Sequence, residues 1–411
     1  MPYTIGLASD YYNLHQRLRY FLTGRPVIES EVAGGGNTGD GFLRELIPKS
    51  GATAQTITLT CTGAGPNATF SVVGSVSGSL GTATSTANSD ETATYLFVST
   101  QVDLKVIDGP TAWAVSDTYV FNIVANPIPG AQQWTELGSN PGVPESGFPH
   151  NWNPVAGTYA NEVYLQGPGL SASDEIHVNM CTYYDETTGY YNLGFCGTIG
   201  YESLETWENQ PNKSTNVAMA AWQYEIPYWF VADGRRFIIS FNISGKYMHG
   251  YFGFILPYGT PTEYPYPLYI AGTLYSFSAT SWTSESHNHR SFYDPYAGYL
   301  YTIEGTWLLI QNKYDSSGNE ISTTVSNIWP YESNLVGNVR QSSGDVYPML
   351  PMIVHTSSNG VNVYGELSGC LWCPGFANAS ENTIIIGGDT YVVLQNVYRT
   401  TNIDYYALKL A

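Results

Sequence analysis

Three apolar or aromatic runs follow one another between residues 230 and 273, and they restrict this chain to β structure more than any other feature. The stretch reads FVADGRRFIISFNISGKYMHGYFGFILPYGTPTEYPYPLYIAGT. A charged turn, DGRR at 233–236, follows the first run, and a Gly/Pro/Tyr-rich loop joins the second to the third. Short apolar runs bounded by turn residues are typical of strands. We expect scaffold strands that present a tyrosine-lined loop for contacts, since no side chain here suggests a nucleophile or a metal cage.

Composition extends this expectation to the whole chain. Charged residues make up only 12% of the 411 residues, whereas Gly (42), Tyr (34) and Pro (23) are abundant. Aromatic and β-branched side chains fit a pleated surface, and Gly and Pro form tight turns. We therefore predict a mainly β fold with a small N-terminal helix, a small β-sandwich unit and a larger jelly-roll-like or lectin-like β-sandwich. The expected divisions are residues 1–50 (helix and Gly-rich arm), 51–126 and 127–411.

The strand candidates are short and separated by turn residues. In the small unit they are 56–61, 69–76, 102–107 and 119–124. In the larger unit they are 162–166, 175–183, 190–201, 228–231, 237–244, 247–256, 268–271, 307–311, 362–366, 383–386 and 391–398. The Ser/Thr/Ala tract 82–94 is predicted to be an exposed, mobile loop.

One helix is predicted near the N-terminus. Ser9 is the expected N-cap, and Gly24 with Pro26 beyond it is the expected stop. Apolar residues recur at helical spacing at Tyr11, Leu14, Leu18, Phe21 and Leu22. This stripe packs either on the chain's own sandwich or on a neighbouring subunit, and the Gly-rich segment 34–39 suggests a flexible tether.

The charge balance excludes several classes of partner. The formal net charge is −19, from 34 acidic and 15 basic residues, so nucleic acid is not an expected partner. An acidic surface also disfavours an anionic membrane, and no apolar run approaches the roughly 18 residues needed to span a bilayer. No secretory signal is visible at the N-terminus, so we expect the chain to fold in a cytoplasm.

Candidate chemistry is sparse, and no cofactor or catalytic residue is predicted. The five cysteines do not form a disulfide framework, and Cys370 and Cys373, at metal-ligand spacing, are read as small buried residues, with a metal site as the alternative. His287 and His289 with Asp294 are read as a solvated loop, again with a metal site as the alternative.

Tyrosines offer a stronger signal, because they give large contact area with few rotors. The interface candidates in loops and strand ends are Tyr258, Tyr264, Tyr266, Tyr269, Tyr293 and Tyr296, together with Tyr11, Leu14, Leu18 and Phe21 of the helix. Packing within the protein's own core is an equally good reading of the tyrosines.

Three segments resemble a family of virion structural proteins of tailed bacteriophages. They are 230–273, quoted above; GDTYVVLQNVYRTTNIDYYALKL at 388–410; and YYDETTGYYNLGFCGTIGYE at 183–202, followed by ENQP at 208–211. The resemblance covers about residues 127–411. It implies a place in a virion tail or baseplate, without enzymatic activity and without an active site to carry over.

Two functions are therefore compared. The first is a multi-copy structural component of a phage tail or baseplate, in contact with other tail proteins and with its own copies in threefold or sixfold symmetry. The second is a receptor-binding virion module whose aromatic loops bind a host-surface glycan. A head–neck collar or decoration role is a further alternative. In each case we expect the chain in the virion, and in the host cytoplasm during assembly.

Overall fold

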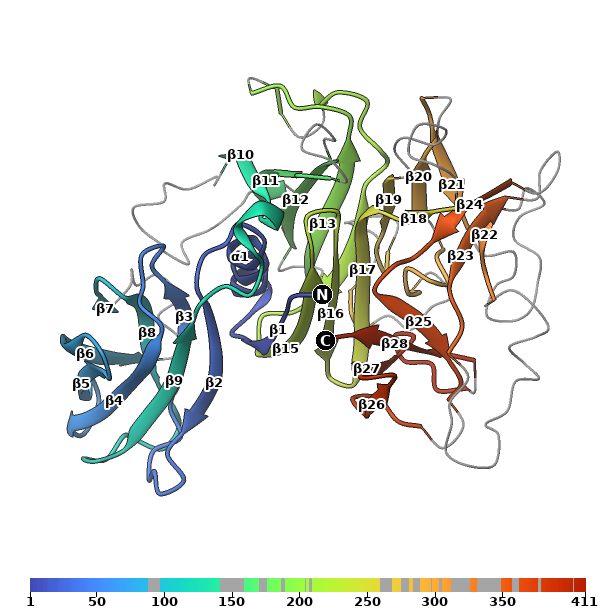
Figure 1. Cartoon of the computed structure of the whole chain (residues 1–411). Coiled ribbons are helices and arrows are strands. Elements are labelled where there is room, and N and C mark those ends of the chain that lie inside the picture. The colour runs from blue at the N-terminus through green and yellow to red at the C-terminus, as the bar shows by residue number, and fades with distance from the viewer. Residues whose placement is uncertain are drawn as a thin grey trace.

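The structure is a computed structural model of the full chain (Figure 1). It describes residues 1–87, 97–140, 159–169, 176–185, 189–203, 205–206, 209–258, 268–274, 281–283, 289–296, 298–302, 305–311, 326–330, 349–356, 362–375, 378–401 and 403–411. Across these residues the chain is mainly β with one short α-helix near its N-terminus, so the predicted fold class is confirmed. None of the helices described is long and apolar enough to cross a bilayer.

A seven-stranded antiparallel sheet forms the centre of the molecule. Its strands, in spatial order, are β1 (Tyr3–Ala8), β15 (Ile226–Ala232), β16 (Arg236–Ile243), β17 (Lys246–Phe254), β19 (Leu268–Ala271), β20 (Gly298–Tyr301) and β21 (Trp307–Ile310). The strands predicted between residues 228 and 271 are confirmed. The turn between β15 and β16 is held by Asp233, whose Oδ1 accepts from the main-chain N–H of Arg235 and Arg236 at 2.8 and 3.1 Å. β1 was not predicted.

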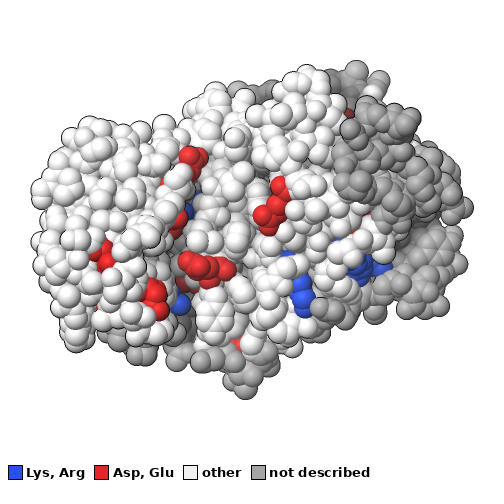
Figure 2. Space-filling model, turned by 90° about the horizontal axis from the view of Figure 1, so that it is seen from below, with Lys and Arg blue, Asp and Glu red and all other residues white. Residues whose placement is uncertain are grey.

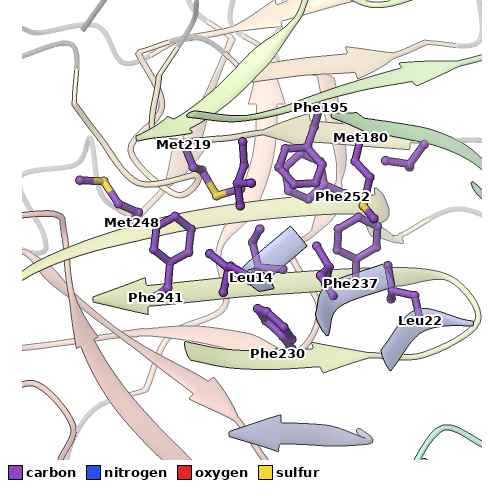
Figure 3. Packing of buried hydrophobic residues seen from close by; sticks show 14 of the residues in the cluster. Leu14, Leu22, Met180, Phe195, Met219, Phe230, Phe237, Phe241, Met248 and Phe252 are labelled. Carbon is purple, nitrogen blue, oxygen red and sulfur yellow. The ribbon is translucent and has the colours of Figure 1, made fainter. Parts of the chain in front are cut away.

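One face of this sheet packs against a second sheet and the helix. The five-stranded sheet contains, in order, β10 (Thr135–Asn140), β11 (Tyr159–Gly167), β12 (Ile176–Asp185), β13 (Tyr190–Thr198) and β14 (Val217–Ala221). Phe237 and Phe252 of the central sheet meet Phe195 of β13 in one buried cluster (Figure 3). The Phe195 and Phe252 rings stack with their centroids 4.2 Å apart.

The opposite face packs against two four-stranded sheets. The first has the order β18 (Leu256–Pro257), β24 (Asn362–Glu366), β23 (Ile353–Thr356), β22 (Ser326–Trp329). The second has the order β25 (Cys370–Cys373), β28 (Tyr405–Lys409), β27 (Asp389–Gln395), β26 (Thr383–Ile386). Ile238 and Tyr251 of the central sheet lie in a buried cluster with side chains of these two sheets. Ile239 lies in the other cluster, on the side of the five-stranded sheet. Both faces are covered along β15, β16, β17 and β19, and these strands are apolar almost without interruption.

A separate lobe contains the eight strands that lie between residues 27 and 124. Its eight strands are β2 (Val27–Ala33), β9 (Thr118–Val124), β4 (Gln55–Gly63), β5 (Thr69–Gly74), β6 (Gly78–Ala87), β8 (Val102–Asp108) and β3 (Phe42–Pro48), with β7 (Phe97–Val98) beside β8. The end strands β2 and β3 lie close together, so the sheet is nearly closed around its own core.

Two predictions for this lobe need correction. Residues 82–87 of the predicted mobile loop belong to β6, which pairs with β5 and with β8, and Ala83 and Ser85 are buried. Residues 88–94 of that predicted loop lie outside the described residues. The Gly-rich segment 34–39 is a loop between β2 and β3 and does not join two separate units. Asp117 fixes it by accepting from the main-chain N–H of Thr38 and Gly39, each at 2.8 Å.

The helix α1 (Tyr11–Leu22) packs inside the chain. Asp10 is its N-cap and accepts from the N–H of Asn13 at 2.7 Å, so the expectation of Ser9 at this position is wrong. A short 3-10 helix, η1 (Gly130–Gln132), precedes β10. The four predicted interface residues of α1 are buried in the cluster shared with the central and five-stranded sheets: Tyr11, Leu14, Leu18 and Phe21. The apolar stripe of α1 therefore packs on the protein's own sheets, which is the first of the two alternatives predicted for it.

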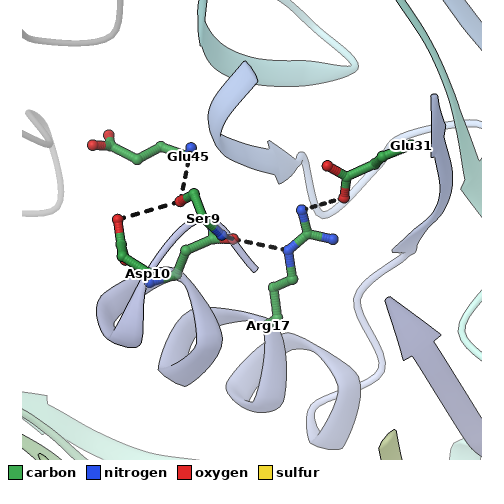
Figure 4. A network of polar contacts seen from close by, with 6 residues as sticks. Ser9, Asp10, Arg17, Glu31 and Glu45 are labelled. Atoms are coloured by element: carbon green, nitrogen blue, oxygen red, sulfur yellow. Dashed lines mark hydrogen bonds and ion pairs between the residues drawn. The ribbon is translucent and has the colours of Figure 1, made fainter. Parts of the chain in front are cut away.

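Polar residues of α1 and of the turn before it connect the helix to the lobe, as Figure 4 shows for Ser9 and Arg17, and to the five-stranded sheet. Arg17 bonds Glu31 of β2 at 2.6 Å, and Arg19 bonds Glu136 of β10 at 2.5 Å. The Ser9 hydroxyl accepts from the N–H of Glu45 in β3 at 3.4 Å. The helix is thus the common packing partner of three sheets.

Candidate interaction surface

The sheet of β18, β24, β23 and β22 has one buried and one outward row of side chains at its centre. Across the strands, Pro257, Gly365, Val354 and Ile328 are register partners, and Val354 and Ile328 are fully buried. The next row is Leu256, Glu366, Ile353 and Trp329. Because successive residues of a strand point to opposite faces, this second row points away from the core. We call it, together with Tyr258 and Val363, the Tyr258 face.

The Tyr258 face exposes more apolar surface than a covered sheet would. Leu256 is 40% exposed, Tyr258 52% and Val363 49%, while Ile353 and Trp329 are half-buried. Isolated exposed apolar residues are normal on proteins, whereas several on one sheet face indicate a contact site. Glu366 is the acidic residue in the row.

The ring of Tyr258 is held in place by this carboxylate. The Tyr258 hydroxyl donates to Glu366 Oε2 at 3.1 Å. Partial burial of the hydroxyl, and secondarily the negative charge of Glu366, raises the pKa of Tyr258 to about 12. The phenol therefore stays protonated near neutral pH and keeps its hydrogen bond, which presents the ring in a fixed orientation.

The other predicted interface tyrosines divide differently. Tyr269 and Tyr293 are fully buried, and their hydroxyls donate to the carbonyls of Phe292 at 2.8 Å and Asp404 at 3.2 Å. Tyr296 is half-buried. Tyr264 and Tyr266 lie outside the described residues. Among the six tyrosines, the structure places Tyr258 at the surface and Tyr269 and Tyr293 in the core.

A buried polar trio connects the central sheet to the C-terminal strands. Ser240 of β16 and Tyr406 of β28 have their hydroxyl oxygens 2.6 Å apart, and these lie 2.9 and 3.0 Å from Nδ1 of His249 in β17. His249 Nε2 lies 2.7 Å from the carbonyl oxygen of Gln395, which assigns the proton to Nε2 and leaves Nδ1 as an acceptor.

This trio has the residue types of a nucleophile and a base but the surroundings of a structural contact. Ser240, His249 and Tyr406 are each fully buried. Burial lowers the pKa of His249 to about 3, which makes its ring a weak base. We assign the trio to holding sheets together. The trio was not predicted from the sequence, although a serine and a histidine inside otherwise apolar strands were the available signal.

The described residues for which a metal site was the alternative reading are buried, and one of them is ion-paired. Cys370 and Cys373 of β25 are buried, and burial raises the pKa of both thiols. Asp294 accepts two bonds from Arg290 Nη1, at 2.9 and 3.0 Å, and His289 is fully buried. The reading of residues 289–294 as a solvated loop is therefore wrong; His287 lies outside the described residues. Within the described part of the chain, three potential ligands do not come together anywhere.

Comparison with known proteins adds little. No family model and no curated protein matches the sequence. A crystal structure of FlgL from Xanthomonas campestris is similar at a TM-score of 0.19 and 16% sequence identity. That match covers 26% of this chain and 33% of the FlgL chain. A similarity of this size carries no argument about fold or function.

Proposed function

We propose that this chain is a non-enzymatic structural component of a tailed-phage virion, located in the tail or baseplate and assembled through contacts with neighbouring subunits. The proposal starts from the resemblance of residues 127–411 to virion structural proteins. One observation carries it: two of the segments that resemble the family, 230–273 and 388–410, pack on each other. Ser240 and His249 of the first segment meet Tyr406 of the second in the buried trio. A resemblance concentrated in mutually packed segments is the pattern of a shared scaffold.

The surface supports assembly more than chemistry. On the face drawn in Figure 2, most of the described surface is uncharged, and acidic and basic side chains form small separate groups. The Tyr258 face supplies an apolar, aromatic area suited to a protein partner. We propose other tail or baseplate proteins and further copies of the chain as partners, with threefold or sixfold symmetry around the tail axis.

A receptor-binding module is the second candidate, and the Tyr258 face favours it too. An exposed tyrosine ring held by Glu366 could stack on a sugar, with the carboxylate accepting from a sugar hydroxyl. A collar or decoration protein has no comparable supporting observation.

The position of the chain in the virion separates these functions. We expect a reconstruction of the phage to place it in the tail or baseplate, and phage that lack the chain to form incomplete tails. Complete, infectious tails without the chain would refute the assembly role. Particles that are complete but fail to adsorb would instead favour receptor binding.

Glycan binding is tested with matched tyrosine variants. Tyr258→Ala should abolish binding of labelled protein to host polysaccharide if the second candidate holds. Tyr224→Ala is the control, since Tyr224 is 57% exposed on the loop before β15 and does not belong to the Tyr258 face. Under the assembly role, we expect neither the wild type nor either variant to bind the polysaccharide at concentrations up to about 100 µM. Polysaccharide binding by the wild type that Tyr258→Ala removes and Tyr224→Ala keeps would overturn this expectation and favour receptor binding.

A further inference from the structure

Among the described residues, strand β26 forms an open edge of the C-terminal sheet. The sheet order β25-β28-β27-β26 places β26 at one end, with β27 as its strand partner, and Figure 1 shows it at the rim of the molecule. Its sequence is Thr-Ile-Ile-Ile. Ile385 is 71% exposed and Ile386 38%, the former being the most exposed large apolar residue of the described chain.

Hydrogen-bonded and non-hydrogen-bonded residue pairs alternate along the β26–β27 hairpin, and this alternation determines which backbone groups of β26 face outward. Ile385 is the register partner of Thr390. The N–H of Thr390 donates to Ala411 and its carbonyl accepts from Leu410, so Thr390 uses its backbone groups on the side away from β26. In an antiparallel ladder, the residue opposite also directs its N–H and C=O away from the pair. Ile385, and by alternation Thr383, therefore point these groups to the open edge.

Nothing in β26 guards this edge in the usual way. Natural edge strands are protected by Lys, Pro, a bulge or an inward-pointing charge. Residues 383–388 contain neither a charged residue nor a proline, and β26 pairs with β27 in unbroken register. The nearest charge on β27, Asp389, is paired with Lys409 at 2.6 Å. In a chain of net charge −19, an uncharged exposed edge is where two copies meet with least repulsion.

We propose that β26 pairs antiparallel with β26 of a second copy, so that two C-terminal sheets become one continuous sheet across the interface. The register that uses both outward-facing residues places Thr383 opposite Ile385 of the other copy, and Ile384 opposite Ile384. It also places the exposed Glu381 opposite Gly387, so that no two carboxylates face each other. The inference deepens the proposed assembly role and rests on it, because it names one surface through which two copies associate. This twofold contact adds to the contacts that close a threefold or sixfold ring and does not replace them.

The backbone hydrogen bond is tested with two variants at one position. Ile385→Pro removes the outward N–H, which the chain's own hairpin does not use, whereas Ile385→Thr keeps it and remains β-branched. We expect sedimentation of the full-length wild type at up to about 100 µM to show a monomer–dimer equilibrium. Ile385→Thr should retain the dimer and Ile385→Pro should be monomeric, both with the wild-type circular dichroism spectrum. A wild type that stays monomeric, or a proline variant that still dimerises, overturns the proposal.

A crosslink tests the register and does not depend on a proline being tolerated. Residues opposite each other in a non-hydrogen-bonded antiparallel pair have Cα atoms about 4.5 Å apart, which suits a disulfide. Ile384→Cys should therefore form a covalent dimer under mild oxidation, and the five native cysteines, all buried, should not. Val76→Cys is the matched control, since Val76 is 67% exposed in the separate lobe. Equal crosslinking of both variants refutes the register.

The outcome is separable from that of the proposed function. A chain found in purified tails without a β26 contact between copies would remove this inference and leave the virion role. A chain that dimerises through β26 in solution but is absent from purified virions would keep the β26 contact and remove the virion role.

Discussion

Replacing His15 by leucine should both stabilise the protein and weaken its response to acid. His15 lies on α1 and is fully buried in the described structure. Neither ring nitrogen has a partner of good hydrogen-bond geometry, although the carbonyl of Met180 lies near the ring. Burial, and secondarily the charge of Arg19, lowers the pKa of His15 to about 3. Leucine removes a polar ring that lost its hydration on folding, which should add about 1–2 kcal/mol to the free energy of unfolding at neutral pH.

The pH dependence follows from linkage between protonation and folding. Below its ordinary pKa near 6.5, His15 binds a proton in the unfolded chain but not in the folded one, so acid favours unfolding. The slope contributed by one such histidine is at most about 1.4 kcal/mol per pH unit. From about pH 7 to about pH 5, wild type should therefore lose about 2 kcal/mol more than His15→Leu.

Urea unfolding at the two pH values, followed by tryptophan fluorescence, measures this difference. Gln16→Leu is the control, since Gln16 is a buried, non-titrating neighbour on the same helix and its replacement should leave the pH dependence unchanged. The carboxylates and the other buried histidines change the free energy of unfolding with pH equally in all three proteins, so their contributions cancel in the comparison. An identical loss in wild type and His15→Leu would refute the account of His15 as a buried neutral group.

Three further predictions concern stability. Ser240→Ala and Tyr406→Phe should each lower the free energy of unfolding by about 1–3 kcal/mol, and the double variant should cost less than their sum in a double-mutant cycle. Lys105→Met should cost about 3–5 kcal/mol because it removes the ammonium 3.1 Å from the buried Glu45 carboxylate, and adding Glu45→Leu should recover most of the loss in urea unfolding. Asp10→Ala should cost about 1 kcal/mol by thermal unfolding, since it removes the N-cap of α1; an unchanged midpoint would contradict that role.

Local patterns predicted many individual elements, whereas several strands were not predicted, among them β2, β3, β14, β20, β22, β23 and β25. The hairpin strands around 233–236, the strand 383–386 and the helix from Tyr11 to Leu22 agree with the structure because turn residues and residue spacing act over a few positions. β1 was also not predicted, and part of β6 was predicted to be a mobile loop. Their sequences, YTIGLA and GSLGTATSTA, are rich in Gly, Ala, Ser or Thr, and pairing with distant strands, β15 and β8, makes them strands.

The candidate site was predicted only in part, because exposure depends on what covers a side chain. Tyr258 and Tyr269 are similar in local sequence, yet one is 52% exposed and the other fully buried. The trio of Ser240, His249 and Tyr406 was beyond local patterns, since its members are up to 166 residues apart.

The amino-acid sequence alone determined a mainly β chain with one short helix and an acidic, sparsely charged composition. Those features depend on composition and on neighbours along the chain. Tertiary structure decided which of the described tyrosines are core and which are surface, that the N-terminal helix packs within its own chain, and that β26 has an open edge among the described strands. These depend on which sheet faces meet and on which described strand ends its sheet, and long-range pairing sets both.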